Sequence, residues 1–124
     1  MGPTDNPEAM KHRTKQLALV IIRLSRTLPP SPEARIIARQ LLRSATSVAA
    51  NYRAVCRARS TADFTSKLGL VLEEADETLF WLELLVDAEI ARPDQVNMPL
   101  DEANQLVSMF VTSLRTVKGL KSEV

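Results

Sequence analysis

Apolar residues recur at helical spacing in the first part of the chain. They are Leu17, Val20, Ile21, Leu24 and Leu28. Residues three, four and seven positions apart lie on one face of an α-helix, so these side chains form a single stripe. Asp5 or Asn6 can cap the exposed amides at its start, and Pro7 suits the first helical turn. Two prolines follow the stripe at 29 and 30, so a helix is predicted over about residues 7–28.

A second helical pattern begins directly after these prolines. Ser31, Pro32 and Glu33 form a start signal, and neither Gly nor Pro interrupts the chain from there to Arg57. The positions that share the apolar side are Ala34, Ala38, Leu41, Ala45, Val48, Tyr52 and Val55. Their spacing predicts a helix over about residues 32–57.

Two further segments have the same character. Ser60 or Thr61 with Asp63 can start a third helix over about residues 62–91, in which only Gly69 weakens the pattern. Its apolar face holds Phe64, Leu68, Val71, Ala75, Leu82 and Leu85. Asn97 is a candidate cap for a fourth helix over about residues 98–119. Its stripe is Leu106, Met109, Phe110, Leu114 and Val117.

Four amphipathic helices joined by short loops are typical of an antiparallel, up-down-up-down four-helix bundle. The length of 124 residues suits one domain, which we assign to residues 1–124. Only 3 Gly and 4% aromatic residues are present, which argues against an all-β chain. The predicted fold class is therefore all-α.

Small residues on the second helix and surplus apolar residues on the third indicate a further contact. Thr46, Ala50 and Ala54 lie away from the predicted core seam and would let another helix approach closely. The third helix carries more large apolar residues than one inward stripe needs, and a contiguous exposed apolar patch usually marks an interface. We expect self-association through Phe80, Trp81 and Leu84. The alternative is that flanking helices and the last loop cover this surface.

Polar residues between the second and third helices predict a buried or half-buried network. Arg43 would need a carboxylate partner, and Glu74 and Glu77 are the candidates because they fall between apolar positions. Ser47 and Asn51 follow Arg43 at steps of four and are expected to supply hydrogen bonds. We interpret this set as structural rather than catalytic, fixing the register of the two helices.

Charge is unevenly distributed along the chain. Residues 1–60 carry 11 Lys/Arg against 3 Asp/Glu, whereas residues 61–124 carry 5 against 12. One interpretation is that basic helices pair with acidic ones through ion pairs worth about 0–1 kcal/mol each. The other is a basic face that meets nucleic acid. Both interpretations hold if the basic and acidic residues remain on separate parts of the folded surface.

The residue inventory argues against several classes of protein. A single Cys, Cys56, cannot form an internal disulfide, which favours the cytoplasm. No apolar run reaches the ~20 residues that span a bilayer, so no membrane association is expected. The one His, His12, has no Glu-x-x-His context, and neither zinc spacing nor a phosphate-binding Gly-rich loop is present. We expect no catalytic site, no metal, no cofactor and no enzymatic activity.

One long stretch carries a family resemblance. It reads QLLRSATSVAANYRAVCRARSTADFTSKLGLVLEEADETLFWLELL, residues 40–85. Its Arg43 before Ser-Ala, the Ser47 and Asn51 pair and the two glutamates ahead of the aromatic-Trp-Leu motif resemble a bacterial family. That family of four-helix bundles is named for proteins encoded within 23S ribosomal RNA intervening sequences. The similarity covers residues ~17 to ~117.

The resemblance implies more than the residues alone do. Members of the family look like antiparallel four-helix bundles that form homopentamers, and no enzymatic activity is attached to them. A relative, the accessory protein of diversity-generating retroelements, shares the fold and is thought to bind nucleic acid and a reverse transcriptase. Many members have an acidic residue shortly after the Asn that corresponds to Asn51. Here Ala54 and Val55 follow Arg53, so this helix end is more basic.

Two functions remain open from the sequence. The first is a homo-oligomer that binds RNA or DNA through phosphate contacts from Arg39, Arg53, Arg57 and Arg59, with help from Lys11, Arg13 and Lys15. Tyr52 is the only aromatic residue near these arginines, which gives little support to base stacking. The second is an oligomeric adaptor or scaffold that presents its acidic or apolar surface to a protein partner, such as a reverse transcriptase, without binding nucleic acid.

Overall fold

Four α-helices account for most of the chain in the computed structural model, which describes residues 6–123, with side chains described up to Gly119. The helices are α1 Pro7–Ser25, α2 Pro32–Val55, α3 Thr61–Asp87 and α4 Pro93–Glu123. No β-strand occurs in this range. The all-α class predicted from the sequence is confirmed.

Side-chain caps begin the first three helices. The Asn6 side chain accepts a hydrogen bond from the Ala9 amide at 3.1 Å, and the Ser31 hydroxyl accepts one from the Ala34 amide at 3.3 Å. The Ser60 hydroxyl likewise accepts one from the Asp63 amide at 3.0 Å. Each bond satisfies one of the amides that a helix start leaves without an intrahelical partner. Asp5, the alternative cap for α1, lies outside the described residues.

Helix ends differ more from the prediction than helix starts. α1 ends at Ser25 rather than near residue 28, and α2 ends at Val55 rather than near residue 57. α3 ends at Asp87 instead of about residue 91 because Glu89 adopts a left-handed conformation with φ 59°. The amides of Ile90 and Ala91 then turn back to the Leu85 carbonyl at 2.9 and 3.0 Å. Only a few non-Gly residues adopt this conformation, so a glutamate here is a weak signal for the stop.

The start of α4 was also predicted wrongly. The helix begins at Pro93, five residues before the expected start, and Pro99 lies inside it rather than in its first turn. The Arg92 amide is satisfied by the Gln95 side chain at 2.9 Å. Pro is favoured in a first helical turn, and α4 has two prolines that could mark one. The first of them, not the second, marks the start.

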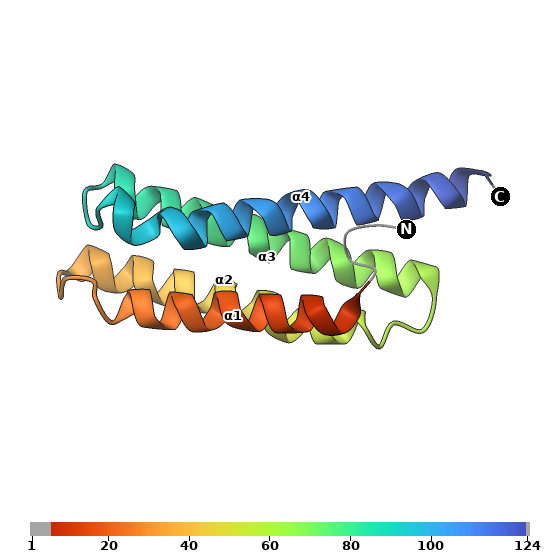
Figure 1. The fold of residues 1–124 in the computed structure, drawn as a ribbon, viewed down its shortest axis with the longest axis horizontal. Coiled ribbons are helices and arrows are strands. Elements are labelled where there is room, and N and C mark those ends of the chain that lie inside the picture. The colour runs from red at the N-terminus through yellow and green to blue at the C-terminus, as the bar shows by residue number, and fades with distance from the viewer. Residues whose placement is uncertain (1–5, 124) are drawn as a thin grey trace.

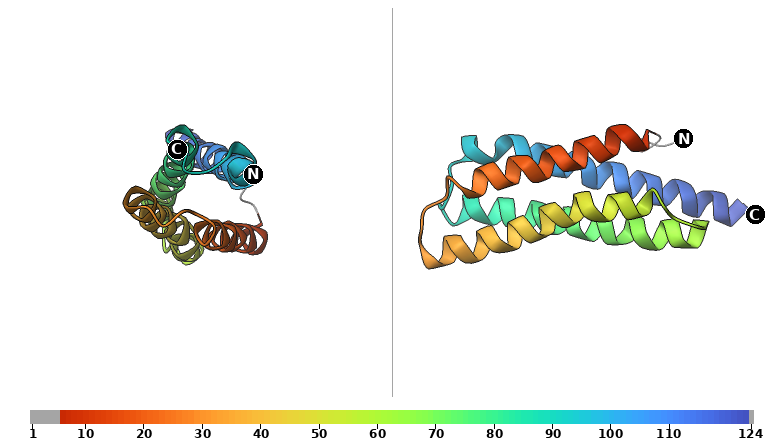
Figure 2. Two further views of the ribbon diagram at one scale, coloured as in Figure 1. Left: turned by 90° about the vertical axis from the view of Figure 1, so that its left-hand side faces the viewer. Right: turned by 90° about the horizontal axis from the view of Figure 1, so that it is seen from below.

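Consecutive helices lie side by side. The α1–α2 and α3–α4 connections lie at the same end of the molecule, and the α2–α3 connection lies at the opposite end (Figure 1). Seen end on, the helices follow one another around the molecule in chain order, with α2 and α4 at opposite corners (Figure 2). α2 packs most extensively against α3, and α1 has its smallest contact with α4.

The inward faces of all four helices meet in one apolar core. Its largest fully buried side chains include Leu17, Ile21, Leu41, Leu68, Leu82, Leu85, Leu106 and Phe110. Tyr52 belongs to it as well, with 3% of its surface exposed and its ring stacked on Phe110 at 6.1 Å between centroids. The buried hydroxyl of Thr78 donates to that of Ser44 at 2.9 Å, which ties α2 to α3 inside the core.

Candidate functional site

Arg43 of α2 lies between two carboxylates of α3. Its Nη1 is 3.2 Å from Glu74 Oε2, its Nη2 contacts Glu77 Oε2, and its Nε donates to Gln40 at 3.3 Å. The Trp81 indole also donates to Glu77, at 3.0 Å. We call these five residues the Arg43 network. The Arg43 side chain is 46% exposed and that of Glu74 is 18% exposed, so the network lies at the rim of the core.

Ser47 and Asn51 do not join the Arg43 network. Both are half-buried on the same flank of α2, but no hydrogen bond links either to Arg43 or to its carboxylates within residues 6–123. A step of four residues turns about 40° around a helix, so each successive position drifts from Arg43 toward the core seam. Their predicted hydrogen bonds are made by Gln40 and Trp81 instead.

The apolar surplus of α3 is only partly covered by its neighbours. Leu82 and Leu85 are fully buried, and Trp81 and Leu84 are half-buried. Phe80 remains 52% exposed and meets Trp81 edge to face, with 4.9 Å between ring centroids. Among the described side chains, Ile36, Leu70 and Met98 are also exposed, at 59%, 49% and 67%.

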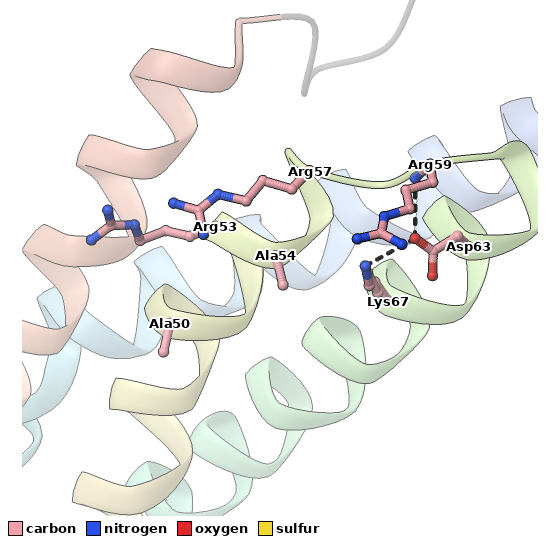
Figure 3. Close-up of a pocket in the computed structure, with 7 residues that line it drawn as sticks. All are labelled: Ala50, Arg53, Ala54, Arg57, Arg59, Asp63 and Lys67. Carbon is pink, nitrogen blue, oxygen red and sulfur yellow. Dashed lines mark hydrogen bonds and ion pairs between the residues drawn. The ribbon is translucent and has the colours of Figure 1, made fainter.

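A hollow of about 700 Å³ lies where the end of α2, the α2–α3 connection and the start of α3 meet. We call it the basic pocket. Its lining residues are Ala50, Arg53, Ala54, Arg57, Arg59, Asp63 and Lys67. Ala54 lies between Arg53 and Arg57 on one side and the Asp63–Lys67 pair on the other, and its side chain is small (Figure 3). The pocket therefore holds four cationic side chains and one carboxylate.

The carboxylate of Asp63 has two partners in the basic pocket. Its Oδ2 accepts hydrogen bonds from Lys67 Nζ at 2.9 Å and from the Arg59 amide at 3.1 Å (Figure 3). The hydrogen bond from Lys67, followed by that from the Arg59 amide, lowers the pKa of Asp63 below its ordinary value. In contrast, none of the guanidinium groups of Arg53, Arg57 and Arg59 forms an ion pair within the described part of the chain. These three cations are available to an anion from outside.

The remaining basic candidates lie elsewhere. Arg39 is 14 residues before Arg53 on α2, which is about 21 Å along the helix axis. Arg13 donates to both carboxylate oxygens of Glu102, at 2.5 and 2.8 Å, and this bond raises its pKa. Lys11 pairs with Glu8 at 3.0 Å. The four arginines proposed as one surface thus separate into the pocket group and Arg39.

Sequence reasoning missed Lys67 as a member of the basic pocket. Its spacing of four residues from Asp63 was a signal for an ion pair on one helix face. That pair is present, but its place in the same pocket as Arg53 and Arg57 depends on how α3 packs against α2. Within residues 6–123, no group of three or more His, Cys, Asp or Glu side chains is arranged to hold a metal ion. None of the described helices is both long and apolar enough to cross a membrane.

The fold and the pocket define a small, all-helical protein with an open cationic hollow at one end. Comparison with known protein families shows which family the chain belongs to. Residues 9–112 match the family model described as 23S rRNA-intervening sequence protein, so the chain belongs to that family, as the resemblance predicted.

A solved structure supports the same assignment. It is a protein of unknown function of the S23 ribosomal protein family from Bacteroides thetaiotaomicron. The two chains are 32% identical, and the match covers 84% of this chain and 96% of the other with a TM-score of 0.77. No curated protein matches the chain.

Proposed function

We propose that this protein is a non-enzymatic homo-oligomer that binds RNA or DNA through backbone phosphates in the basic pocket. The observation that carries the proposal is the group of three guanidiniums, from Arg53, Arg57 and Arg59, that no described carboxylate pairs with. A guanidinium presents its donors as a fork that matches two phosphate oxygens. With Asp63 as its single acid, the pocket attracts anions.

The lining of the pocket favours phosphate contacts over contacts to bases. No aromatic residue lines it, and Tyr52, the nearest aromatic residue in sequence, is buried against Phe110. Stacking on aromatic rings is the usual way in which single-stranded bases are held. Phosphate contacts position a protein on nucleic acid without selecting a sequence. We therefore expect binding that depends strongly on salt and little on base sequence.

Self-association strengthens this proposal. The family resemblance supports an antiparallel, up-down-up-down bundle that assembles as a homopentamer, and the exposed ring of Phe80 with the adjoining Trp81 and Leu84 is a candidate contact. One pocket makes only a few phosphate contacts. Several pockets on one assembly would bind a long nucleic acid far more tightly, because each contact after the first is intramolecular.

An oligomeric adaptor without nucleic-acid binding is the second candidate. The observation that favours it is the exposure of Ile36, Phe80 and Met98, which leaves apolar surface for a protein partner. A reverse transcriptase is one such partner that the family resemblance suggests. The two functions predict different effects of salt on binding affinity. Only phosphate binding releases counterions in proportion to the contacts made, so only it should weaken steeply as the salt concentration rises.

The test measures binding of a fluorescently labelled mixed RNA pool by anisotropy over a series of salt concentrations, with light scattering to report the mass of the complex. The Arg53→Ala, Arg57→Ala variant should bind more weakly at low salt. For a duplex, its salt slope should fall by about 0.9 for each phosphate that the variant no longer neutralises. Arg23→Ala, an exposed arginine of α1, is the matched control and should change neither quantity. Binding that ignores the pocket variant, or no binding at low salt, would leave the adaptor as the better function.

A further inference from the structure

A groove between α3 and α4 is apolar at its base and acidic at its edges. Two adjoining hollows of about 430 and 160 Å³ form it at the end of the molecule where α3 stops and α4 starts. Leu79, Val86 and Leu100 supply apolar lining, and the charged residues around them are Glu83, Asp87 and Asp101. We call this hollow the α3–α4 groove.

Glu83 and Asp87 of the α3–α4 groove have no described cation paired with them, whereas Asp101 lies near Arg13 and helps to raise its pKa. None of Glu83, Asp87 and Asp101 forms an ion pair within residues 6–123, and no basic residue lines either hollow. The Gln105 side chain joins Asp101 to Arg13: its amide nitrogen donates to Asp101 at 2.8 Å, and its oxygen accepts from Arg13 at 2.6 Å. The groove therefore suits an occupant that combines an apolar side chain with positive charge.

The chain itself carries a surface of that description. Arg35, Ile36 and Arg39 lie near the start of α2, and all three are exposed. Ile36 is 59% exposed, and neither arginine forms an ion pair in the described structure. Residues three and four apart are neighbours on a helix, so Arg39 lies beside both Arg35 and Ile36. We call these residues the α2 patch.

The α2 patch cannot fill the α3–α4 groove of its own molecule. α2 and α4 lie at opposite corners of the bundle, and α3 stands between them (Figure 2). Both surfaces nevertheless lie at the same end, where α2 starts, α3 ends and α4 starts (Figure 1). Two copies standing side by side could therefore bring the patch of one to the level of the groove of the other.

We infer that the α2 patch of one copy docks in the α3–α4 groove of a second copy. Ile36 enters between Leu79 and Leu100, and Arg35 and Arg39 pair with the carboxylates at the edges. The two surfaces differ, so the contact is head to tail and leaves one patch and one groove open. Repetition of such a contact closes into a ring when the rotation between copies allows it. This inference rests on the self-association proposed above and names the surfaces that make it.

The contact also explains the position of Arg39. This arginine lies about 21 Å along α2 from the basic pocket, so the copy-to-copy contact gives it a role separate from phosphate binding. Phe80 lies on α3 one turn before Glu83 and is half exposed, so the apolar surface predicted for self-association adjoins the groove.

A charge exchange tests the inference, with solution mass measured by light scattering at low salt. Arg39→Glu and Glu83→Arg should each shift the assembly toward monomer and raise its dissociation constant at least tenfold. The double variant should regain most of the assembly, because the charges are complementary again. Ile36→Ser should weaken it without changing the circular dichroism spectrum. Arg23→Glu and Glu73→Arg, exposed charges outside the two surfaces, are the matched controls.

Each outcome has one meaning. An assembled wild-type protein whose mass is unchanged by both single variants would overturn this contact and leave self-association intact. Two dissociated single variants whose combination does not reassemble would also overturn the direct pairing. A wild-type protein that is monomeric at high concentration would overturn self-association itself. Recovery of mass in the double variant alone establishes the contact.

Discussion

Replacement of Arg43 by Ala tests the link between α2 and α3 most directly. The guanidinium contacts both Glu74 and Glu77, and Glu77 also accepts the Trp81 indole hydrogen bond. Without Arg43, two carboxylates one turn apart on α3 face each other with no cation between them. Like charges at this spacing destabilise a helix, and Glu74, with an 18% exposed side chain, is poorly placed to regain water.

The size of the effect follows from the exposure of the partners. An exposed ion pair contributes about 0.2–1 kcal/mol, and loss of a partner costs more where the remaining charge is shielded from water. Two pairs with one half-exposed arginine should together be worth about 1.5 kcal/mol. The corresponding fall in melting temperature is about 5 °C for a domain of this size. Arg59→Ala removes an exposed side chain without an ion pair and should change stability by less than about 0.5 kcal/mol.

The assay is urea unfolding followed by far-ultraviolet circular dichroism near neutral pH. All variants are compared at one protein concentration, because self-association makes apparent stability depend on concentration. A cycle of Arg43→Ala, Glu77→Gln and the double variant separates the pair from each residue's own contribution. We expect a coupling energy of at least about 0.5 kcal/mol. Trp81 is the one tryptophan, so its fluorescence should also respond to Glu77→Gln.

Equal and small effects of Arg43→Ala and Arg59→Ala would refute the reasoning. They would mean that water and side-chain motion screen the Arg43 network as they screen an isolated surface pair. A large effect of Arg43→Ala with no coupling to Glu77 would instead assign the stability to the packing of the arginine stem on its neighbours.

Three further outcomes are expected. Because Lys67 and the Arg59 amide hold the pKa of Asp63 below its ordinary 3.8, the stability it contributes is present above that value and is lost as pH falls through the lowered pKa. Asp63→Asn should therefore be less stable than the wild type near neutral pH, and urea unfolding should show that the gap closes in strong acid. Leu84→Arg should dissociate the assembly, and an unchanged solution mass would remove Leu84 from the interface. Arg13→Ala should raise amide hydrogen exchange in α1 more than in α3, because it removes the ion pair to Glu102 from the smallest helix contact.

The sequence by itself determined that the chain forms four helices and approximately where each of them lies. Apolar spacing, polar caps and prolines act over a few residues, so they specify a helix without reference to the rest of the chain. The caps at Asn6, Ser31 and Ser60 illustrate this, since each lies within three residues of the amide that it satisfies. The family resemblance rested on equally local motifs. The end of α3 escaped prediction because Glu89 supplies the left-handed turn without a glycine.

Only the tertiary structure decided which charged side chains form ion pairs within the protein and which remain free to bind another molecule. Arg13 meets Glu102 across 89 positions of sequence, and Arg43 meets Glu77 across 34. Which partner each arginine reaches depends on the register and rotation of packed helices, and no local pattern contains that information. The same packing buries Tyr52 against Phe110 and brings Lys67 into one pocket with Arg53 and Arg57. Helix periodicity predicts which face of a helix is apolar. The proposed function depends instead on which residues the polar faces contact, and this is set by helix packing.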